Sequence, residues 1–293
     1  MRLGIVTATL DYLRAEDCIL SWVAGMPSLV EVYVVLQGQG STGWTTHWSE
    51  SGLYTVQRRV REILGVVPAF AIGVQKALED GCEIIACLHD DLEIQEHGWD
   101  ETVSRLFRAC PRAGLCGFGG GKGLGSDDIY QTPYNPMQLA RQGFRSNMRD
   151  AEAHGVRSTV AEPVACLDGF SQIGVRAYWQ GVPHLLLRAS PLPDQDPNLF
   201  AYMERLGIIH HAYDSALGAY AKMLGYQVWF LPVKCHHFGG RTAVGDARYQ
   251  DWASNYQYED QETGRGGQGD QGFWEKSHRV VYELFRDILP IRT

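Results

Sequence analysis

The stretch EIIACLHDDLEI, residues 83–94, decides the fold class, because an apolar run of strand length ends abruptly in polar side chains. His89, Asp90 and Asp91 follow that run directly. Adjacent carboxylates repel each other and are costly to desolvate, so a positive partner is expected beside them. In an open parallel sheet, ligands bind beyond the carboxyl ends of the strands. The stretch therefore predicts a Mg²⁺ or Mn²⁺ site completed by a substrate phosphate, and the alternative is a simple cap of the following turn.

Strand-like and helix-like segments alternate before this stretch. Apolar, β-branched runs predict strands, and apolar residues that recur at helical spacing predict helices. The predicted strands cover residues 2–8, 29–37 and 83–88, and the predicted helices cover residues 14–24, 55–64 and 69–81. The helix over 55–64 is predicted from Val56, Val60 and Leu64. This alternation predicts an α/β fold whose mixed, mainly parallel sheet is flanked by helices on both faces.

Composition limits the class of protein. The chain has 293 residues and 45% apolar residues, which suffices for one large globular domain or two small ones. A net charge of −8 argues against generic nucleic-acid binding. The seven cysteines include no C-x-x-C pair, and most lie in apolar runs, which predicts reduced core thiols. Because neither a signal peptide nor a membrane-spanning run is apparent, a cytoplasmic protein is expected.

The pattern changes after residue 111. The glycine-dense segment Gly117–Gly125 predicts a mobile loop on the acceptor side, with Lys122 as a candidate phosphate ligand. Residues 138–155 have a helical pattern. Such a helix would align three arginines on one face, namely Arg141, Arg145 and Arg149. That stripe is either a solvated face or a binding surface for an anionic ligand.

Five further elements are predicted toward the C-terminus. Residues 159–175 predict a strand, a loop and a second strand, and residues 226–233 predict another strand. Helices are predicted over residues 213–225 and 276–289. The second of these helices would close the chain.

Two segments resemble the GT-A glycosyltransferases, especially the family 2-like group. One is LHDDLEI, residues 88–94, which is similar to the D-x-D-type motif at a strand end in that family, with His89 at its first position. The other is HHAYDSALGAYAKMLGYQVWFLPVKCHH, residues 210–237. It is similar to a family segment in which an acidic residue precedes a helix, Gly-Tyr, a strand and a late histidine. The resemblance covers about residues 2–240.

The resemblance implies which residues bind the metal and the donor. Asp91, with His89 and His237, would hold Mn²⁺ or Mg²⁺, and His237 is preferred to His236. The donor nucleotide would contact Asp90 and the ends of the first two strands, represented by Thr7, Ala8, Thr9 and Gln37.

The resemblance also implies the catalytic residues. Asp214 would take the proton from the acceptor hydroxyl, and Asp168, followed by Gly169, is the next candidate for that role. Two structural alternatives stay open at this point. Asp214 is also a suitable N-cap for the helix that follows it, and Asp-Gly readily forms an ordinary turn.

The implied activity is the metal-dependent transfer of a sugar from a nucleoside diphosphate sugar, expected to be UDP-linked, to a hydroxyl acceptor with inversion. The implied domain covers residues 1–240, with a nucleotide-sugar half (1–110) and an acceptor half (111–240), and residues 241–293 would extend it. A nucleotidyltransferase and a non-catalytic nucleotide- or carbohydrate-binding module are the alternatives. The acceptor stays open among proteins, glycans, small molecules and modified nucleic acids.

Overall fold

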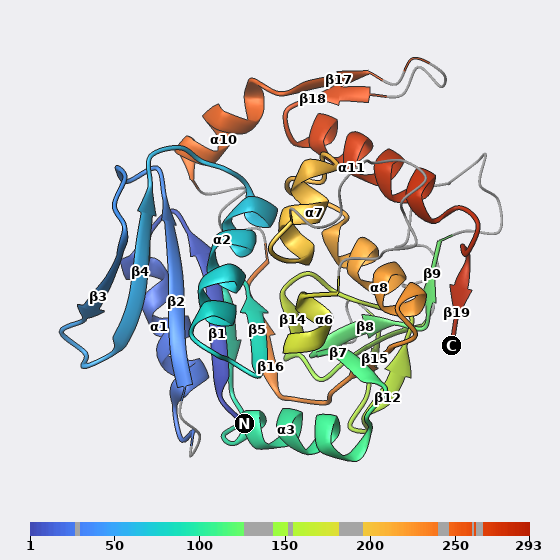
Figure 1. Ribbon diagram of the computed structural model, residues 1–293, viewed down its shortest axis with the longest axis horizontal. Coiled ribbons are helices and arrows are strands. Elements are labelled where there is room, and N and C mark those ends of the chain that lie inside the picture. Colours follow the sequence, from blue (N-terminus) through green and yellow to red (C-terminus); the bar gives the residue numbers. More distant parts are fainter. Residues whose placement is uncertain are drawn as a thin grey trace.

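The computed structural model describes residues 1–26, 30–125, 143–151, 155–181, 196–239, 246–259, 261 and 266–293. Its centre is a nine-stranded sheet (Figure 1). In spatial order the strands are β12 (Glu162–Val164), β15 (Gln227–Phe230), β7 (Ala113–Gly117), β14 (Ser171–Val175), β5 (Ile84–Leu88), β1 (Leu3–Thr9), β2 (Val30–Gln37), β4 (Tyr54–Val60) and β3 (Trp44–Trp48).

The sheet is mixed, as expected. Parallel pairs join β5, β1, β2 and β4 in the first half of the chain, and one further parallel pair joins β7 and β15. In contrast, β14, β12 and β3 are antiparallel to their neighbours. The predicted α/β fold with a mixed sheet between helices is therefore confirmed, and its parallel character belongs mainly to the first half.

Helices cover both faces of the sheet (Figure 1). One face carries α1 (Tyr12–Val23) and α3 (Trp99–Ala109), and the other carries α2 (Val66–Glu79), α7 (Leu199–Arg205), α8 (Tyr213–Met223) and α11 (Asp270–Phe285). The alternation of β1 produces this division, because Ile5 packs in the cluster that contains α1 whereas Val6 packs in the cluster that contains α2. At Gly73 a Cβ atom would lie 2.3 Å from Val6, so glycine allows α2 to approach the sheet closely.

Short strand pairs complete the described part of the chain. The strand β8 (Gly119–Gly121) lies between β10 (Phe144–Ser146) and β13 (Cys166–Leu167), with β11 (Val156–Arg157) beside β10. The remaining pairs are β6 (Leu92–Ile94) with β16 (Cys235–His237), β17 (Gln257–Glu259) with β18 (Gly266–Gln268), and β19 (Ile291–Arg292) with β9 (Gly123–Leu124). The short helices are α6 (Arg176–Trp179) and α10 (Ala247–Ser254). Of these elements, the β6–β16 pair positions the candidate site.

The C-terminal segment packs against the rest of the molecule. Val281 and Phe285 of α11 belong to the same apolar cluster as α8, and Tyr249 of α10 packs with Leu10. The boundary between residues 1–240 and 241–293 stays a prediction. Within the described residues, no helix combines the length and the apolar character that crossing a membrane requires.

Residues 55–64 do not form the expected helix. Their first part belongs to β4, which pairs with β2 and β3. Val56 and Val60 misled the prediction, because a spacing of four places side chains on one face of a strand as well as of a helix. Thr55 and Gln57 are buried on the other face of β4, which is the alternation of a strand.

The glycine-dense segment forms buried strands, so the prediction of a mobile loop is wrong. A Cβ atom at Gly120 would lie 2.7 Å from the Cys166 carbonyl oxygen, so glycine serves the close approach of β8 and β13. Lys122 lies 2.6 Å from a carboxylate oxygen of Glu162 and donates to the Pro163 carbonyl at 2.8 Å. The expected role of Lys122 toward a phosphate is therefore not supported.

The helix over residues 138–155 is also wrong in its described part. Arg145 lies in β10, where its Nε is 3.1 Å from Glu162 Oε1, and Arg149 lies in a turn. Arg141 is outside the described residues. Arg145 and Arg149 therefore share no helical stripe.

Candidate functional site

Strand pairing brings the late histidine to the acidic strand end. After β5 ends, the chain turns through residues 89–91 and continues as β6, which pairs antiparallel with β16. The register places His237 opposite Leu92, and the Phe238 N–H donates to the Asp91 carbonyl at 3.0 Å. Asp91 and His237 are 146 positions apart in the chain numbering but adjacent in this ladder. In this arrangement the His236 ring lies beside the Phe238 ring, with centroids 4.2 Å apart and the planes tilted by 50°.

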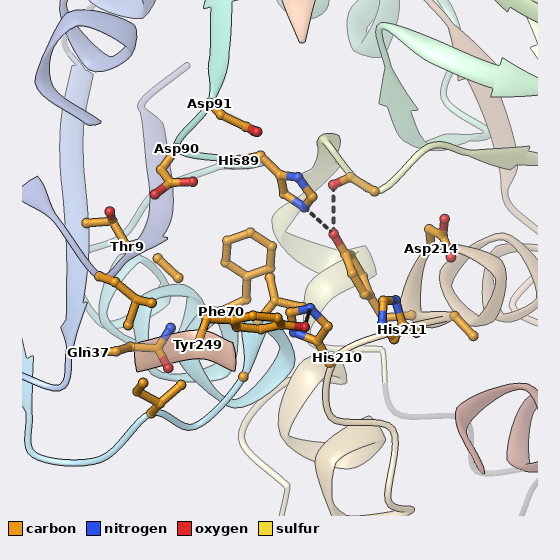
Figure 2. A pocket seen from close by; sticks show the side chains of 18 of the residues that line it. Thr9, Gln37, Phe70, His89, Asp90, Asp91, His210, His211, Asp214 and Tyr249 are labelled. Carbon is orange, nitrogen blue, oxygen red and sulfur yellow. Dashed lines mark hydrogen bonds between the residues drawn. The ribbon is translucent and has the colours of Figure 1, made fainter. Parts of the chain in front are cut away.

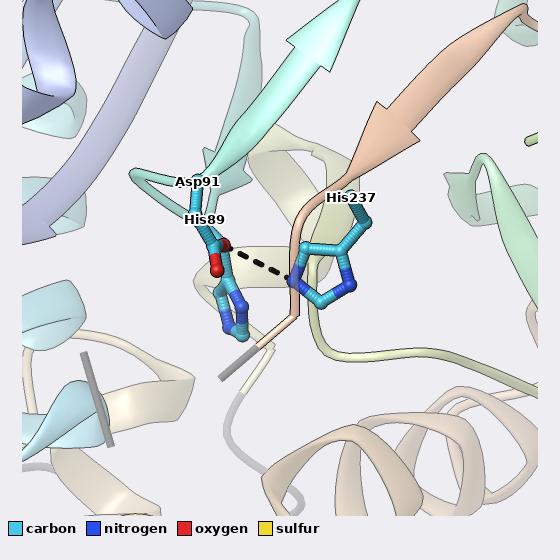
Figure 3. A group of neighbouring side chains, drawn as sticks. All are labelled: His89, Asp91 and His237. Atoms are coloured by element: carbon cyan, nitrogen blue, oxygen red, sulfur yellow. Dashed lines mark ion pairs between the residues drawn. The ribbon is translucent and has the colours of Figure 1, made fainter. Parts of the chain in front are cut away.

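His89, Asp91 and His237 form a group that can bind a cation (Figure 3). One ligand atom from each lies within 4.8 Å of the others. Asp91 Oδ1 and His237 Nε2 are 3.1 Å apart, yet Nε2 is buried and makes no hydrogen bond of acceptable geometry. Two neighbouring ligands of an octahedral cation at about 2.1 Å would be about 3.0 Å apart, so this spacing fits a shared cation.

The chemistry of the three side chains narrows the choice of cation. Two imidazoles and one carboxylate suit Mn²⁺ and other transition metals better than Mg²⁺, which prefers oxygen ligands. The group therefore fits the predicted metal site, with Mn²⁺ favoured over Mg²⁺.

Tyr213 fixes the tautomer of His89. The Tyr213 hydroxyl donates its single proton to the Gly169 carbonyl at 2.9 Å, and His89 Nε2 lies 2.7 Å from the same hydroxyl oxygen (Figure 2). His89 Nε2 must therefore carry a proton and donate it, which leaves the lone pair of Nδ1 for a cation. Gly169 permits this arrangement, because a Cβ atom there would lie 2.5 Å from the Tyr213 hydroxyl.

The pKa values of the two histidines shift in opposite directions. Burial, reinforced by the neighbouring His237, lowers the pKa of His89 to about 4, so His89 is neutral at physiological pH. Burial also disfavours the charged form of His237, but the contact with Asp91 and its negative charge outweigh that effect and raise the pKa of His237. A cation bound to this group would displace the proton that Asp91 favours on His237.

A cavity of about 310 Å³ adjoins this group. Its lining residues come from several elements and are Ala8, Thr9, Leu10, Gln37, Ile63, Gly65, Val66, Phe70, His89, Asp90, Asp91, Asp168, Gly169, His210, His211, Ala212, Tyr213, Asp214 and Tyr249. Figure 2 shows Thr9, Gln37 and Asp90 on one side and Asp214 with His211 on the other. Most of the predicted site residues thus meet at one cavity. Thr7, whose side chain is fully buried, and His237 are not among the lining residues.

Thr9, Gln37 and Asp90 line the side of the cavity that is predicted to bind the donor nucleotide. Gln37 accepts a hydrogen bond from the Leu64 N–H through Oε1 at 2.7 Å, so its amide orientation is fixed. Thr9 holds the turn at the end of β1, because its hydroxyl donates to the Asp11 carbonyl at 3.0 Å. Burial, opposed by a hydrogen bond from Thr9, raises the pKa of Asp90 to about 6. A cation or a hydrogen-bond donor from a ligand would stabilise the ionised form of Asp90.

Asp214 occupies the first turn of α8 at the opposite side of the cavity. It follows Ala212, whose φ of 60° is a left-handed conformation that only a few per cent of non-glycine residues adopt. Asp214 Oδ1 accepts from the Ser215 N–H at 2.7 Å. Burial and the nearby charge of Asp168 raise the pKa of Asp214 to about 6. Asp214 is thus a carboxylate poised to exchange a proton near neutral pH, and a strained backbone holds it in place.

Asp168 shows the turn geometry that the sequence allowed. Its Oδ1 atom lies 3.4 Å from the Phe170 N–H, and its carbonyl accepts from Gln172 at 3.0 Å. It nevertheless lines the cavity together with Asp214. Both carboxylates are therefore available to a ligand in the cavity.

Several lining residues were not predicted. Phe70 and Tyr249 come from α2 and α10, and the consecutive histidines His210 and His211 precede α8. The pair His210–His211 was a signal in the sequence, because histidine is a common metal ligand and proton-transfer group. Tyr249 gave no such signal, since only the packing of the C-terminal segment brings it to the cavity.

The comparison with solved structures concerns the fold of the chain. It is structurally similar to GT-A glycosyltransferases, with a central mixed sheet and flanking helices, at a low sequence identity that does not specify a family. No family model and no curated protein matches the sequence. The fold class is therefore established by structure alone.

Three solved structures that match the chain are as follows. GalNAc-T7, crystallised with UDP, GalNAc and Mn²⁺, is 12% identical with a TM-score of 0.51, and the match covers 99% of this chain and 56% of that one. A197 from STIV is 10% identical with a TM-score of 0.39, covering 81% and 86%. TarS from S. aureus is 13% identical with a TM-score of 0.43, covering 80% and 37%. The chain thus spans about half the length of the GalNAc-T7 chain.

Proposed function

We propose that the protein transfers a sugar from a nucleoside diphosphate sugar to a hydroxyl acceptor in a metal-dependent reaction. The observation that carries the proposal is the group His89, Asp91 and His237 beside a cavity that also holds two carboxylates. A cation site alone has many uses, and a carboxylate pair alone has many uses. Together, on a fold similar to GT-A glycosyltransferases, they supply the two needs of sugar transfer, which are leaving-group neutralisation and proton removal.

The cation would be held by Asp91 Oδ1, His237 Nε2 and His89 Nδ1. When bound, it would neutralise the charge that develops on the departing nucleoside diphosphate. Tyr213 keeps His89 in the required tautomer through the 2.7 Å contact described above. Mn²⁺ is the proposed ion because the set contains two imidazoles, and GalNAc-T7 was crystallised with Mn²⁺ and UDP.

Asp214 is the proposed general base. A catalytic base works best with a pKa near the operating pH, and the pKa of Asp214 is raised to about 6. The acceptor oxygen would lose its proton to Asp214 as it forms the bond to the anomeric carbon, while the bond from that carbon to the diphosphate oxygen breaks. A single displacement of this kind inverts the anomeric configuration. Asp168 is the alternative base, since it lines the same cavity.

The nucleotide would occupy the side of the cavity formed by the ends of β1 and β2. Ala8, Thr9, Gln37 and Asp90 line that side, and UDP is the proposed nucleotide. The fixed Gln37 amide leaves its N–H₂ group to donate to a ligand, since Oε1 already accepts from Leu64. The acceptor would then approach from the side of Asp214.

The test is a donor and metal screen on the full chain. A panel of nucleoside diphosphate sugars is incubated with a mixture of acceptors, with Mn²⁺, with Mg²⁺ or with chelator, and products are identified by mass spectrometry. Release of nucleoside diphosphate together with a glycosylated product in Mn²⁺ supports the proposal. Pyrophosphate formation from a nucleoside triphosphate would indicate a nucleotidyltransferase. Binding of donor without turnover across the panel would indicate a binding module.

A pair of variants makes the screen specific. Asp91→Asn keeps the size of the side chain but weakens a metal ligand, whereas Asp251→Asn changes an exposed aspartate of α10 outside the cavity. Loss of metal-stimulated turnover in the first variant and its retention in the second would assign the metal requirement to this group.

A further inference from the structure

A second group of metal-binding side chains lies at the other end of the cavity. His210 and His211 precede α8, and Asp270 is the first residue of α11. One ring nitrogen from each histidine and one carboxylate oxygen of Asp270 lie within 4.8 Å of one another. His210 and His211 line the cavity, whereas Asp270 approaches them from the C-terminal segment. The group therefore joins two parts of the chain that are distant in sequence.

Hydrogen bonding leaves one nitrogen of His210 without a partner. The Tyr249 hydroxyl donates its proton to Asp270 Oδ1 at 2.7 Å, and His210 Nε2 lies 2.8 Å from that hydroxyl oxygen. Because the hydroxyl has no second proton, His210 Nε2 must donate to it, and His210 Nδ1 then carries a lone pair. His210 Nδ1 is buried and has no hydrogen-bond partner. A buried acceptor without a donor is unfavourable, and a cation would satisfy it.

The other two members of the group are accessible from solvent. His211 Nε2 and Asp270 Oδ1 are 2.8 Å apart, with side-chain exposures of 28% and 54%. Such exposure provides an entry path for an ion. A cation would take the place of the direct contact between these two side chains.

We propose that His210, His211 and Asp270 bind a divalent cation of the zinc class. Two imidazoles and one carboxylate with an open fourth position are a set that Zn²⁺ favours, and Mg²⁺ disfavours it. Tyr249 is the positioning residue, because it orients both His210 and Asp270. The bound ion ties the N-terminus of α11 to the chain that leads into α8. This inference is independent of sugar transfer.

The test uses Co²⁺ as a spectroscopic probe for Zn²⁺. In a chain that carries His89→Gln and His237→Gln, the first group is disabled, and visible d–d absorption of Co²⁺ reports binding at the second. We expect about one Co²⁺ per chain, displaced by Zn²⁺ and not by Mg²⁺. Adding His211→Gln or Asp270→Asn should remove the absorption. The matched changes His47→Gln and Asp251→Asn, at exposed positions outside both groups, should leave it unchanged.

A second measurement protects the test against misfolding of the double variant. In the otherwise native chain, zinc content after dialysis is measured with and without Asp270→Asn, and the melting temperature is recorded with and without Zn²⁺. We expect Asp270→Asn to lower the zinc content by about one per chain and to reduce the Zn²⁺-dependent rise in melting temperature. No Co²⁺ or Zn²⁺ binding in the parent chains, or equal binding in the His211→Gln and Asp270→Asn variants, would overturn the proposal.

Discussion

The two groups of histidine and aspartate have the same composition but different surroundings. Each contains two imidazoles and one carboxylate, and in each a tyrosine hydroxyl lies against the Nε2 atom of one histidine. In the first group the side chains of Asp91 and His237 are only 9% and 20% exposed. In the second group His211 and Asp270 are 28% and 54% exposed.

The difference in burial decides what a cation contributes at each place. A buried carboxylate has lost much of its hydration, so its attraction for a cation is strong and little screened. An exposed carboxylate keeps its water, so ion binding there gives a smaller gain. The first group is therefore expected to be essential for chemistry, and the second is expected to bind more weakly and to act on structure.

The largest expected effect comes from Asp91→Asn. Because the variant weakens the metal site, turnover in Mn²⁺ should fall by roughly 10²-fold or more. The equivalent change in the second group, Asp270→Asn, should lower turnover by less than about tenfold, since it does not touch the first group. Steady-state kinetics of both variants at saturating donor give the comparison. Equal losses in the two variants would contradict the distinction between the groups.

Asp214→Asn separates proton transfer from metal binding. Asparagine keeps the shape of the side chain but cannot accept the acceptor proton, so turnover should fall by roughly 10²-fold while donor affinity changes little. The measurement is turnover together with calorimetric titration of donor in Mn²⁺. Turnover near the wild-type value would transfer the base role to Asp168.

The two tyrosines allow a matched test of the comparison. Tyr213→Phe removes the hydroxyl that fixes His89, and Tyr249→Phe removes the one that fixes His210. Loss of such an orienting partner weakens metal affinity by about 10- to 100-fold. Tyr213→Phe should therefore affect Mn²⁺ binding at the first group, and Tyr249→Phe should affect Co²⁺ binding at the second. Titrations that show the reverse pattern, or no change, would remove the assigned roles of the tyrosines.

The pH dependence of activity follows from Asp214. Because its pKa is raised to about 6, the base is protonated below that pH, and turnover should fall about tenfold for each pH unit below about 6. Measurement of kcat against pH for the wild-type protein checks this limb, with donor held at saturation. A flat profile down to about pH 4, the ordinary range for aspartate, would show that Asp214 is not the base.

The smallest expected effect is on stability. The folded-state pKa of Asp214 lies above its unfolded value, so between about pH 4 and 6 the folded state binds more protons and stability falls as pH rises. Asp214→Asn removes this penalty, so near pH 7 the variant should melt a few degrees higher than wild type. Thermal unfolding at pH 4 and pH 7 tests the sign. A variant that is less stable at pH 7 would show that Asp214 mainly stabilises α8.

The sequence predicted those parts of the fold in which local pattern and final structure agree. The strand ending at Leu88 and the helix α2 are apolar enough to be recognised alone. It failed where one spacing fits two structures, as for Val56 and Val60 in β4. It also failed for Arg145 and Arg149, which lie in a short strand and in a turn instead of on one helix. A spacing of four serves both strand and helix, so only pairing with neighbours settles which one forms.

The sequence predicted those residues of the candidate site that lie at the ends of strands. Asp91 was predicted from the chemistry of the strand end, and His237 from the resemblance to a family. Tyr213 and Tyr249 were not predicted, because their roles depend on hydrogen bonds between segments far apart in the chain. The glycines of β8 were misjudged because close strand packing and loop mobility both require glycine.

Electron paramagnetic resonance of Mn²⁺ tests the central claim most directly. Free Mn²⁺ is titrated with metal-free wild-type protein and with His237→Gln, each with and without UDP. The wild-type protein should bind about one Mn²⁺ per chain more tightly when UDP is present, because the diphosphate completes the coordination shell. His237→Gln should lose that UDP-dependent binding. Wild-type binding that UDP does not strengthen, or equal UDP-dependent binding in the variant, would contradict a metal-assisted nucleotide site at His89, Asp91 and His237.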